Sequence, residues 1–249
     1  MDVGIGDLFE DGLGFGSKTA RSVRDVLLKP RRYFLAAQTK DWSDYTPSIR
    51  VYVVLLALAS YFRYLYIGEG QVMTELYVGM FEQMIAELGE EQPRWLEADP
   101  RALTDAVLDR LLFYTPFVSF ALYTLFGLAW RAYAEPLSAA VRIRYIYALL
   151  IPAQILLLLS TFPMVFLPDA YVSWASTGGL LLSAAAVSIT AYLGAFPETE
   201  SAGGRFGRAL TLGVALIIVM LVATTISLLS GMFMSFAEVA QSLPPKVDS

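Results

Sequence analysis

The sequence predicts an all-α fold of the polytopic membrane class: a bundle of five transmembrane helices, preceded by interfacial helices and carrying an external acidic helical hairpin. Of its 249 residues, 56% are hydrophobic and only 16% are charged, whereas a soluble domain has about a quarter charged residues. The apolar residues gather in runs of roughly 18 to 25, the length that crosses about 30 Å of hydrocarbon. Composition and run length together favour one membrane bundle.

The region before the first apolar run divides into two parts. Residues 1–16 are expected to be a flexible tail, because their phosphate-loop-like letters GLGFGSKT have Ser17 between Gly16 and Lys18 and no preceding strand. Residues 17–45 are expected to form short basic, amphipathic helices separated by Pro30. These helices either lie on the anionic cytoplasmic leaflet or pack against the cytoplasmic end of the bundle, and the sequence favours neither reading.

The first span is expected over residues 46–68. Thr46 has the side chain of a helix N-cap and Pro47 suits the first helical position. Arg63 lies about one turn before the end of this span. We interpret it as a side chain that snorkels to the interface, with a buried functional charge as the alternative reading.

Residues 69–110 have a different pattern, with ten acidic residues against three arginines. Apolar residues recur at helical spacing from Val72 to Leu88, opposite a row of glutamates. Asp99-Pro100 then predicts the start of a second helix. We expect a solvent-facing helical hairpin whose Met- and Phe-rich face folds down over the bundle or, less favoured, receives a partner helix.

The remaining spans are expected at residues 111–130, 145–166, 175–196 and 209–231, followed by an external C-terminal tail at 232–249. Pro116 predicts a kink in the second span, and Pro152 with Gln154 interrupts the apolar run of the third. The fourth span carries small residues, among them Gly179 and Ser183, along one stripe. Such stripes let helices approach closely in lipid.

The distribution of positive charge predicts the orientation. With a cytoplasmic N-terminus, the cytoplasmic segments hold 13 of the 18 Lys and Arg residues and the external segments hold four, with Arg63 in the membrane. The positive-inside rule therefore places the N-terminus in the cytoplasm and, with five spans, the C-terminus outside. We expect a multi-pass protein of a bacterial inner membrane.

The residues that could carry chemistry are few. The chain has no His, Cys or Asn, and the expected spans contain no Asp or Glu, so we expect no catalysis, no metal, no cofactor and no nucleic-acid partner. The residues singled out for a functional or packing role are Arg63, Pro116, Pro152, Gln154, Gly179 and Ser183.

Two segments carry a family resemblance. The segment VRDVLLKPRRYFLAAQTKDWSDYTPSIRVYVVLLALASYF, with Tyr45, Pro47, Arg50 and Tyr52 leading into the first span, resembles the start of a bacterial membrane family, domain of unknown function 3667. The segment TPFVSFALYTLFGLAWRAYAEPLSAAVRIRYIYALLIPAQI is similar to the second and third spans of that family. The LLKPRRYF phrase and the five spans are also similar to bacterial Yip-type membrane proteins.

These resemblances imply a helical inner-membrane protein without assigned catalysis. Many members of the first family carry a Cys-rich zinc ribbon, which this cysteine-free chain cannot form. The usual His of the connector is also absent, since Pro136 and Leu137 stand in that region.

Two functions follow as hypotheses. The first is a non-enzymatic scaffold, accessory subunit or lipid-organising component, with the lipid bilayer as its main partner and a membrane protein or a second copy of the chain as further candidates. The second is a transporter of small solutes or lipids, based on the proline-containing spans and Arg63. A polar cavity that reaches Gln154 would favour transport, whereas a dry core would favour the scaffold.

Overall fold

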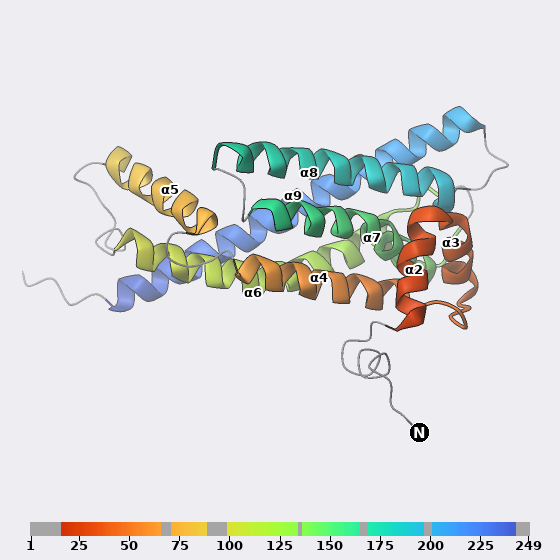
Figure 1. Cartoon of the computed structure of the whole chain (residues 1–249), viewed down its shortest axis with the longest axis horizontal. Helices are drawn as coiled ribbons and strands as arrows, with labels where there is room; N and C mark the ends of the chain where they lie inside the picture. The colour runs from red at the N-terminus through yellow and green to blue at the C-terminus, as the bar shows by residue number, and fades with distance from the viewer. Residues whose placement is uncertain are drawn as a thin grey trace, which may run out of the picture. The chain divides into compact units, whose positions relative to one another are not determined.

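The computed structural model describes residues 16–65, 71–88, 99–133, 136–164, 169–196 and 201–242, and within these ranges the fold is all-α, with no strand. Figure 1 shows the helices in chain order: α2 (Ser17–Leu28), α3 (Pro30–Thr39), α4 (Ser48–Tyr64), α5 (Val72–Leu88), α6 (Pro100–Ala129), α7 (Ala139–Met164), α8 (Asp169–Thr190), the π-helix η2 (Ala191–Ala195) and α9 (Ala202–Ser242). The predicted all-α class is confirmed for these residues. Apart from Gly16, the expected tail at 1–16 lies outside the described residues, as does most of the second half of the C-terminal tail.

Four of these helices are long and apolar enough to cross a membrane: Pro100–Ala129, Ala139–Ser160, Thr177–Ala195 and Ala202–Gln241. They correspond to the four spans expected after the hairpin, and they mark the chain as a membrane protein. The helix expected to be the first span, α4, has 17 described residues, about 26 Å, and falls short of the roughly 20 residues that span a bilayer. The count of five spans therefore stays a prediction.

The outward side chains of α9 are large and apolar over most of its length. Its exposed hydrophobic residues follow one another at intervals of three or four, so each lies beside the next along the helix surface: Phe206, Leu210, Val214, Ile218, Val222, Ile226, Leu229 and Phe233. A continuous apolar face of this length is unfavourable in water and stable in lipid. Lipid is thus the medium in which this helix face is expected.

Two helices join segments that the sequence analysis separates. The second hairpin helix and the span at 111–130 form one helix, α6, which continues through Pro116. The span at 209–231 extends at both ends into the 41-residue α9. The physical reason is that charged residues such as Arg110 and Glu238 mark the edge of the apolar stretch without interrupting the backbone hydrogen bonds, so the helix runs on beyond it.

The chain forms two compact units. The first unit consists of Met1–Ala59 and Phe120–Leu221, and its core is built around fully buried residues of α4, α7 and α9, including Tyr52, Ile146 and Leu212. The second unit consists of Ser60–Ser119 and Val222–Ser249. In it, Phe81 of α5 is buried against Leu103 and Val107 of α6 and packs on Phe236 of α9, with ring centroids 6.0 Å apart.

Helix α5 packs on α6 and α9 within the second unit. Phe81 is covered, whereas Leu76 and Met80 of the same expected apolar set remain exposed, so the folded-down hairpin stays a prediction. Ion pairs join the same elements, since Arg110 of α6 pairs with Glu238 of α9, and Arg101 of α6 lies 3.4 Å from Glu75 of α5. The expected cap of α6 is confirmed, because the Leu103 amide donates to the Asp99 carbonyl at 3.0 Å.

Candidate functional site

The N-terminal cap, defined here as α2, α3 and the connection 40–47, is the part of the first unit richest in polar contacts. Its inner face is apolar: Val26, Tyr33, Phe34 and Ala37 are at most 1% exposed and belong to the core of the first unit. The Phe34 ring meets Tyr145 of α7 edge-on at 4.8 Å. The cap is therefore built into the first unit and is not a loosely attached segment.

A glycine permits the contact between the cap and η2. A Cβ atom placed on Gly194 would lie 2.7 Å from Cδ2 of Phe34 and 2.9 Å from Cβ of Pro30. Both distances are far below van der Waals contact, so any larger residue would push α3 away from η2. The interruption at Pro30, read from the sequence as a helix divider, is confirmed, because α3 begins at this residue.

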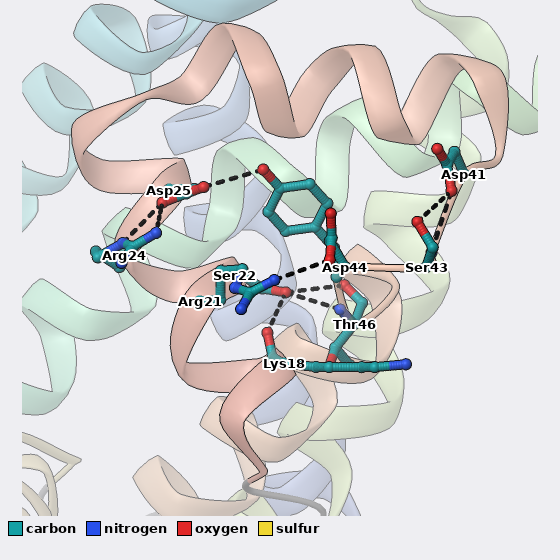
Figure 2. A network of polar contacts seen from close by, with 10 residues as sticks. Lys18, Arg21, Ser22, Arg24, Asp25, Asp41, Ser43, Asp44 and Thr46 are labelled. Carbon is teal, nitrogen blue, oxygen red and sulfur yellow. Dashed lines mark hydrogen bonds and ion pairs between the residues drawn. The ribbon is translucent and has the colours of Figure 1, made fainter.

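A buried carboxylate links the beginning and the end of the cap. The Asp25 side chain is 4% exposed, and the Tyr45 hydroxyl donates to its Oδ2 at 2.9 Å. Nε of Arg24 donates to Oδ1 of Asp25 at 2.8 Å, as Figure 2 shows. Desolvation alone would raise the pKa of Asp25. The hydrogen bonds from Arg24 and Tyr45 and the charges of Arg24 and Lys29 together hold that pKa below its usual value.

Thr46 is fixed from two helices at the point where the chain turns into α4. Its amide donates to the Ser22 hydroxyl at 2.8 Å, its carbonyl accepts from the Tyr33 hydroxyl at 2.8 Å, and its hydroxyl lies 2.9 Å from that of Thr19. The expected helix-capping role of Thr46 is therefore wrong. Pro47 is the residue immediately before α4, since its carbonyl accepts the first backbone hydrogen bond of this helix, from the Val51 amide at 3.1 Å.

Two exposed acids complete the network of Figure 2. Asp44 pairs with Arg21 at 2.8 Å. Asp41 accepts from the hydroxyl and the amide of Ser43 at 2.8 and 3.1 Å, and these hydrogen bonds lower the pKa of Asp41. Lys40, between α3 and Asp41, has a φ of 63°, which lets the chain reverse direction after α3.

Several arginines of the first unit bind carbonyl oxygens near helix ends, where backbone acceptors lack partners and the helix dipole is negative. Arg142 donates to the carbonyls of Gly127, Leu128 and Leu137 at 3.2, 2.7 and 3.0 Å, so it caps the end of α6. Arg144 donates to the Ala37 carbonyl near the end of α3 at 3.1 Å. These arginines fasten helix ends to one another.

The same arrangement closes the end of α8 and η2. Arg31 of the cap donates to the Phe196 carbonyl at 3.1 Å. Arg205 of α9 donates to the Tyr192 carbonyl at 2.8 Å and lies over the Tyr192 ring at 4.6 Å. The arginine side chains that the sequence marked only as cytoplasmic charge thus have structural partners.

Four of the predicted site residues lie on the α7–α8 pair, Pro152 and Gln154 on α7 and Gly179 and Ser183 on α8. The Ser183 hydroxyl donates to the Gly179 carbonyl at 2.7 Å and lies 3.5 Å from the Ala153 carbonyl of α7. A Cβ on Gly179 would be 3.0 Å from the Ser160 hydroxyl. Pro152 is buried on α7. Gly179 and Ser183 of the small-residue stripe therefore lie where α8 approaches α7 closely.

Gln154 faces α4, and the two remaining predicted site residues lie in the second unit. Gln154 is 9% exposed, and its amide reaches the Tyr52 hydroxyl of α4 at 3.5 Å. Arg63 lies in the last turn of α4 in the second unit, where its charge offsets part of the burial that raises the pKa of Tyr77. Pro116 lies within α6 in the second unit.

Sequence reasoning missed the Asp25–Tyr45 pair. One signal was present: Asp25 is the only acid between Ser17 and Lys40, in a segment with seven cations. An acid among so many bases readily finds a positively charged partner, and a carboxylate with such a partner can be buried. Tyr45, 20 residues away, could be found only from the packing of the connection on α2.

Comparisons with known protein families, with curated proteins and with solved structures find no match to this chain.

Proposed function

We propose that the chain is a non-enzymatic scaffold, accessory or lipid-organising component of a bacterial inner membrane, with the N-terminal cap on the cytoplasmic side and the C-terminus outside. The observation that carries the proposal is the use of its polar groups. In the first unit, arginines hold helix ends together and Asp25 holds the cap, so these groups support a fixed architecture.

Hydroxyl groups within the apolar helices support the same reading. The Ser183, Ser188 and Ser227 hydroxyls each donate to the carbonyl four residues earlier in their own helix, at 2.7 to 2.9 Å. Thr115 and Thr124 do the same. Hydroxyls bonded in this way have used their donor and contribute to packing in lipid.

The orientation rests on the location of the basic residues. The 13 Lys and Arg residues of the expected cytoplasmic segments all belong to the first unit, and the cap contributes seven of them. Retention of this end in the cytoplasm follows from the positive-inside rule. Membership of the domain of unknown function 3667 family, or of the Yip-type proteins, is part of the proposal and rests on the sequence phrases alone.

The test is co-purification from native membranes after crosslinking, combined with solute flux in proteoliposomes. A scaffold or accessory subunit is expected to co-purify with a membrane protein, or with a second copy of itself, in a fixed ratio, and to leave liposome permeability unchanged. Recovery of the chain as a partner-free monomer that carries solute across the bilayer would overturn the proposal.

The alternative, a transporter of small solutes or lipids, is favoured by one polar cluster. The Gln154 amide faces the Tyr52 hydroxyl, and the Tyr52 ring lies 5.1 Å from that of Tyr147, whose hydroxyl is 2.8 Å from Thr124. If this cluster lines a route, Gln154→Leu would abolish a measured flux, and the packing control Gly178→Ala would not. In a scaffold, neither variant changes liposome permeability.

A further inference from the structure

The outward face of the N-terminal cap combines leucines with cations. Leu27, Leu28 and Leu35 are 46%, 72% and 57% exposed. Arg24 precedes Leu28 by one helical turn, and Arg31 and Arg32 precede Leu35 by one turn, so each leucine has basic neighbours on its own helix face. We call this surface the Leu–Arg face: Leu27, Leu28 and Leu35 with Arg24, Lys29, Arg31 and Arg32.

Packing within the described part of the chain does not account for these leucines. The opposite face of the cap already supplies Val26, Tyr33 and Phe34 to the core of the first unit. Exposed Leu193 of η2 and Phe206 of α9 show that apolar surface continues on neighbouring elements of the same unit. In Figure 1, α2 runs across the direction of α7 and α8. When α7 and α8 cross a bilayer, α2 therefore lies along its surface.

The four cations of this face differ in whether a hydrogen bond or an ion pair holds them. Arg24 is paired with Asp25, and Arg31 donates to the Phe196 carbonyl. The side chains of Lys29 and Arg32 make no hydrogen bond or ion pair with any residue in the part of the chain that the structure describes, and both are exposed. Flexible cations beside exposed leucines are complementary to a surface that is apolar inside and anionic at its boundary.

We propose that the Leu–Arg face is a docking surface for anionic phospholipids of the cytoplasmic leaflet. The leucines enter the boundary between headgroups and acyl chains, and Lys29 and Arg32 bind lipid phosphates. The proposal rests on the orientation given under the proposed function and names the lipid class that this end of the protein organises. It also resolves the two readings of residues 17–45, because the cap packs on the bundle with one face and on lipid with the other.

The experiment uses the full chain purified in dodecyl maltoside, with bound lipid counted by native mass spectrometry. Short-chain phosphatidylglycerol is titrated against phosphatidylcholine of the same chain length. The wild-type chain is expected to prefer phosphatidylglycerol, and Lys29→Gln/Arg32→Gln is expected to weaken its binding about 25-fold, at roughly five-fold per cation near an anionic surface. Leu28→Ser/Leu35→Ser is expected to weaken the binding of both lipids.

The matched control is Lys18→Gln/Lys40→Gln, which removes two cations from the same cap away from the Leu–Arg face and is expected to keep the preference. Equal binding of the two lipids by the wild-type chain, or an equal loss in the control, would overturn the proposal. Displacement of phosphatidylglycerol by millimolar inorganic phosphate would do the same, since it would indicate a site for soluble anions. The titration needs neither a partner nor a solute, so flux in proteoliposomes would refute the scaffold and leave this result standing.

Discussion

Replacing Gly194 tests the contact between the cap and η2. In Gly194→Ala, the new methyl group would stand 2.7 Å from the Phe34 ring and 2.9 Å from Pro30. Both neighbours are buried, so α3 must move or the ring must leave its position, which costs about 1 to 3 kcal/mol for an overpacked core. For a chain of this length that corresponds to a fall of roughly 2 to 12 °C in Tm.

The assay is thermal unfolding in detergent by scanning fluorimetry, with hydrogen exchange of α3 as the local measurement. Gly178→Ala is the matched control, because a Cβ at Gly178 meets nothing within 4 Å, and alanine is the better helix former. The control is expected to unfold at or slightly above the wild-type temperature. If the two variants unfold together and α3 stays equally protected from exchange in both, the packing described for the cap is refuted.

Three further predictions concern charged groups. Asp25→Asn is expected to lower the free energy of unfolding by about 1 to 3 kcal/mol, whereas the exposed Asp44→Asn should lower it by at most about 0.5 kcal/mol. Because the folded pKa of Asp25 is lowered, its stabilising contribution is present above about pH 4 and is lost as the pH falls through that lowered value. A series of unfolding measurements at decreasing pH should therefore show this loss in the wild-type chain and not in Asp25→Asn. Arg142→Gln removes three hydrogen bonds to carbonyls and should lower the free energy of unfolding by about 2 kcal/mol or more. The exposed control Arg131→Gln should stay within about 0.5 kcal/mol of the wild-type chain. Equal unfolding temperatures for the two variants would contradict the capping role of Arg142. In intact cells, an impermeant thiol reagent should label Glu82→Cys and should reach Arg131→Cys only after permeabilisation; the reverse pattern would invert the orientation.

The long apolar runs made the helical class and most of the spans predictable. Lipid demands that every backbone polar group be bonded within the segment, so a run of this length has only a helix available to it. The start of α6 at Pro100 was equally predictable, because Asp99 and Pro100 satisfy local rules for a helix N-terminus. These features depend on residues close together in the sequence.

The ends of the long helices were not predictable in the same way. Hydropathy marks the ends of an apolar stretch, and the predicted spans end at those positions. Helix α9 continues from Ala202 to Ser242 because Arg205 before the apolar stretch and Phe236 after it also find partners. Helix length was therefore decided by tertiary contacts and by good helix formers outside the bilayer.

The contacts of the cap depend on packing between distant segments. Arg144 reaches the Ala37 carbonyl across 107 positions, and Arg31 reaches Phe196 across 165. Composition showed that these arginines would gather at one end of the protein, but it could not show that helix-end carbonyls would bind them. By contrast, Gly179 and Ser183 were found by their spacing, since a stripe of small residues already describes a face that packs closely.

The central claim is that lipid surrounds most of these helices, and membrane extraction tests it most directly. Membranes from expressing cells are washed with alkaline carbonate, and the chain is followed in pellet and supernatant. We predict that it stays in the pellet and enters solution only with detergent, because faces such as that of α9 expose large apolar side chains. Release by carbonate into a form that stays monodisperse without detergent would contradict the account.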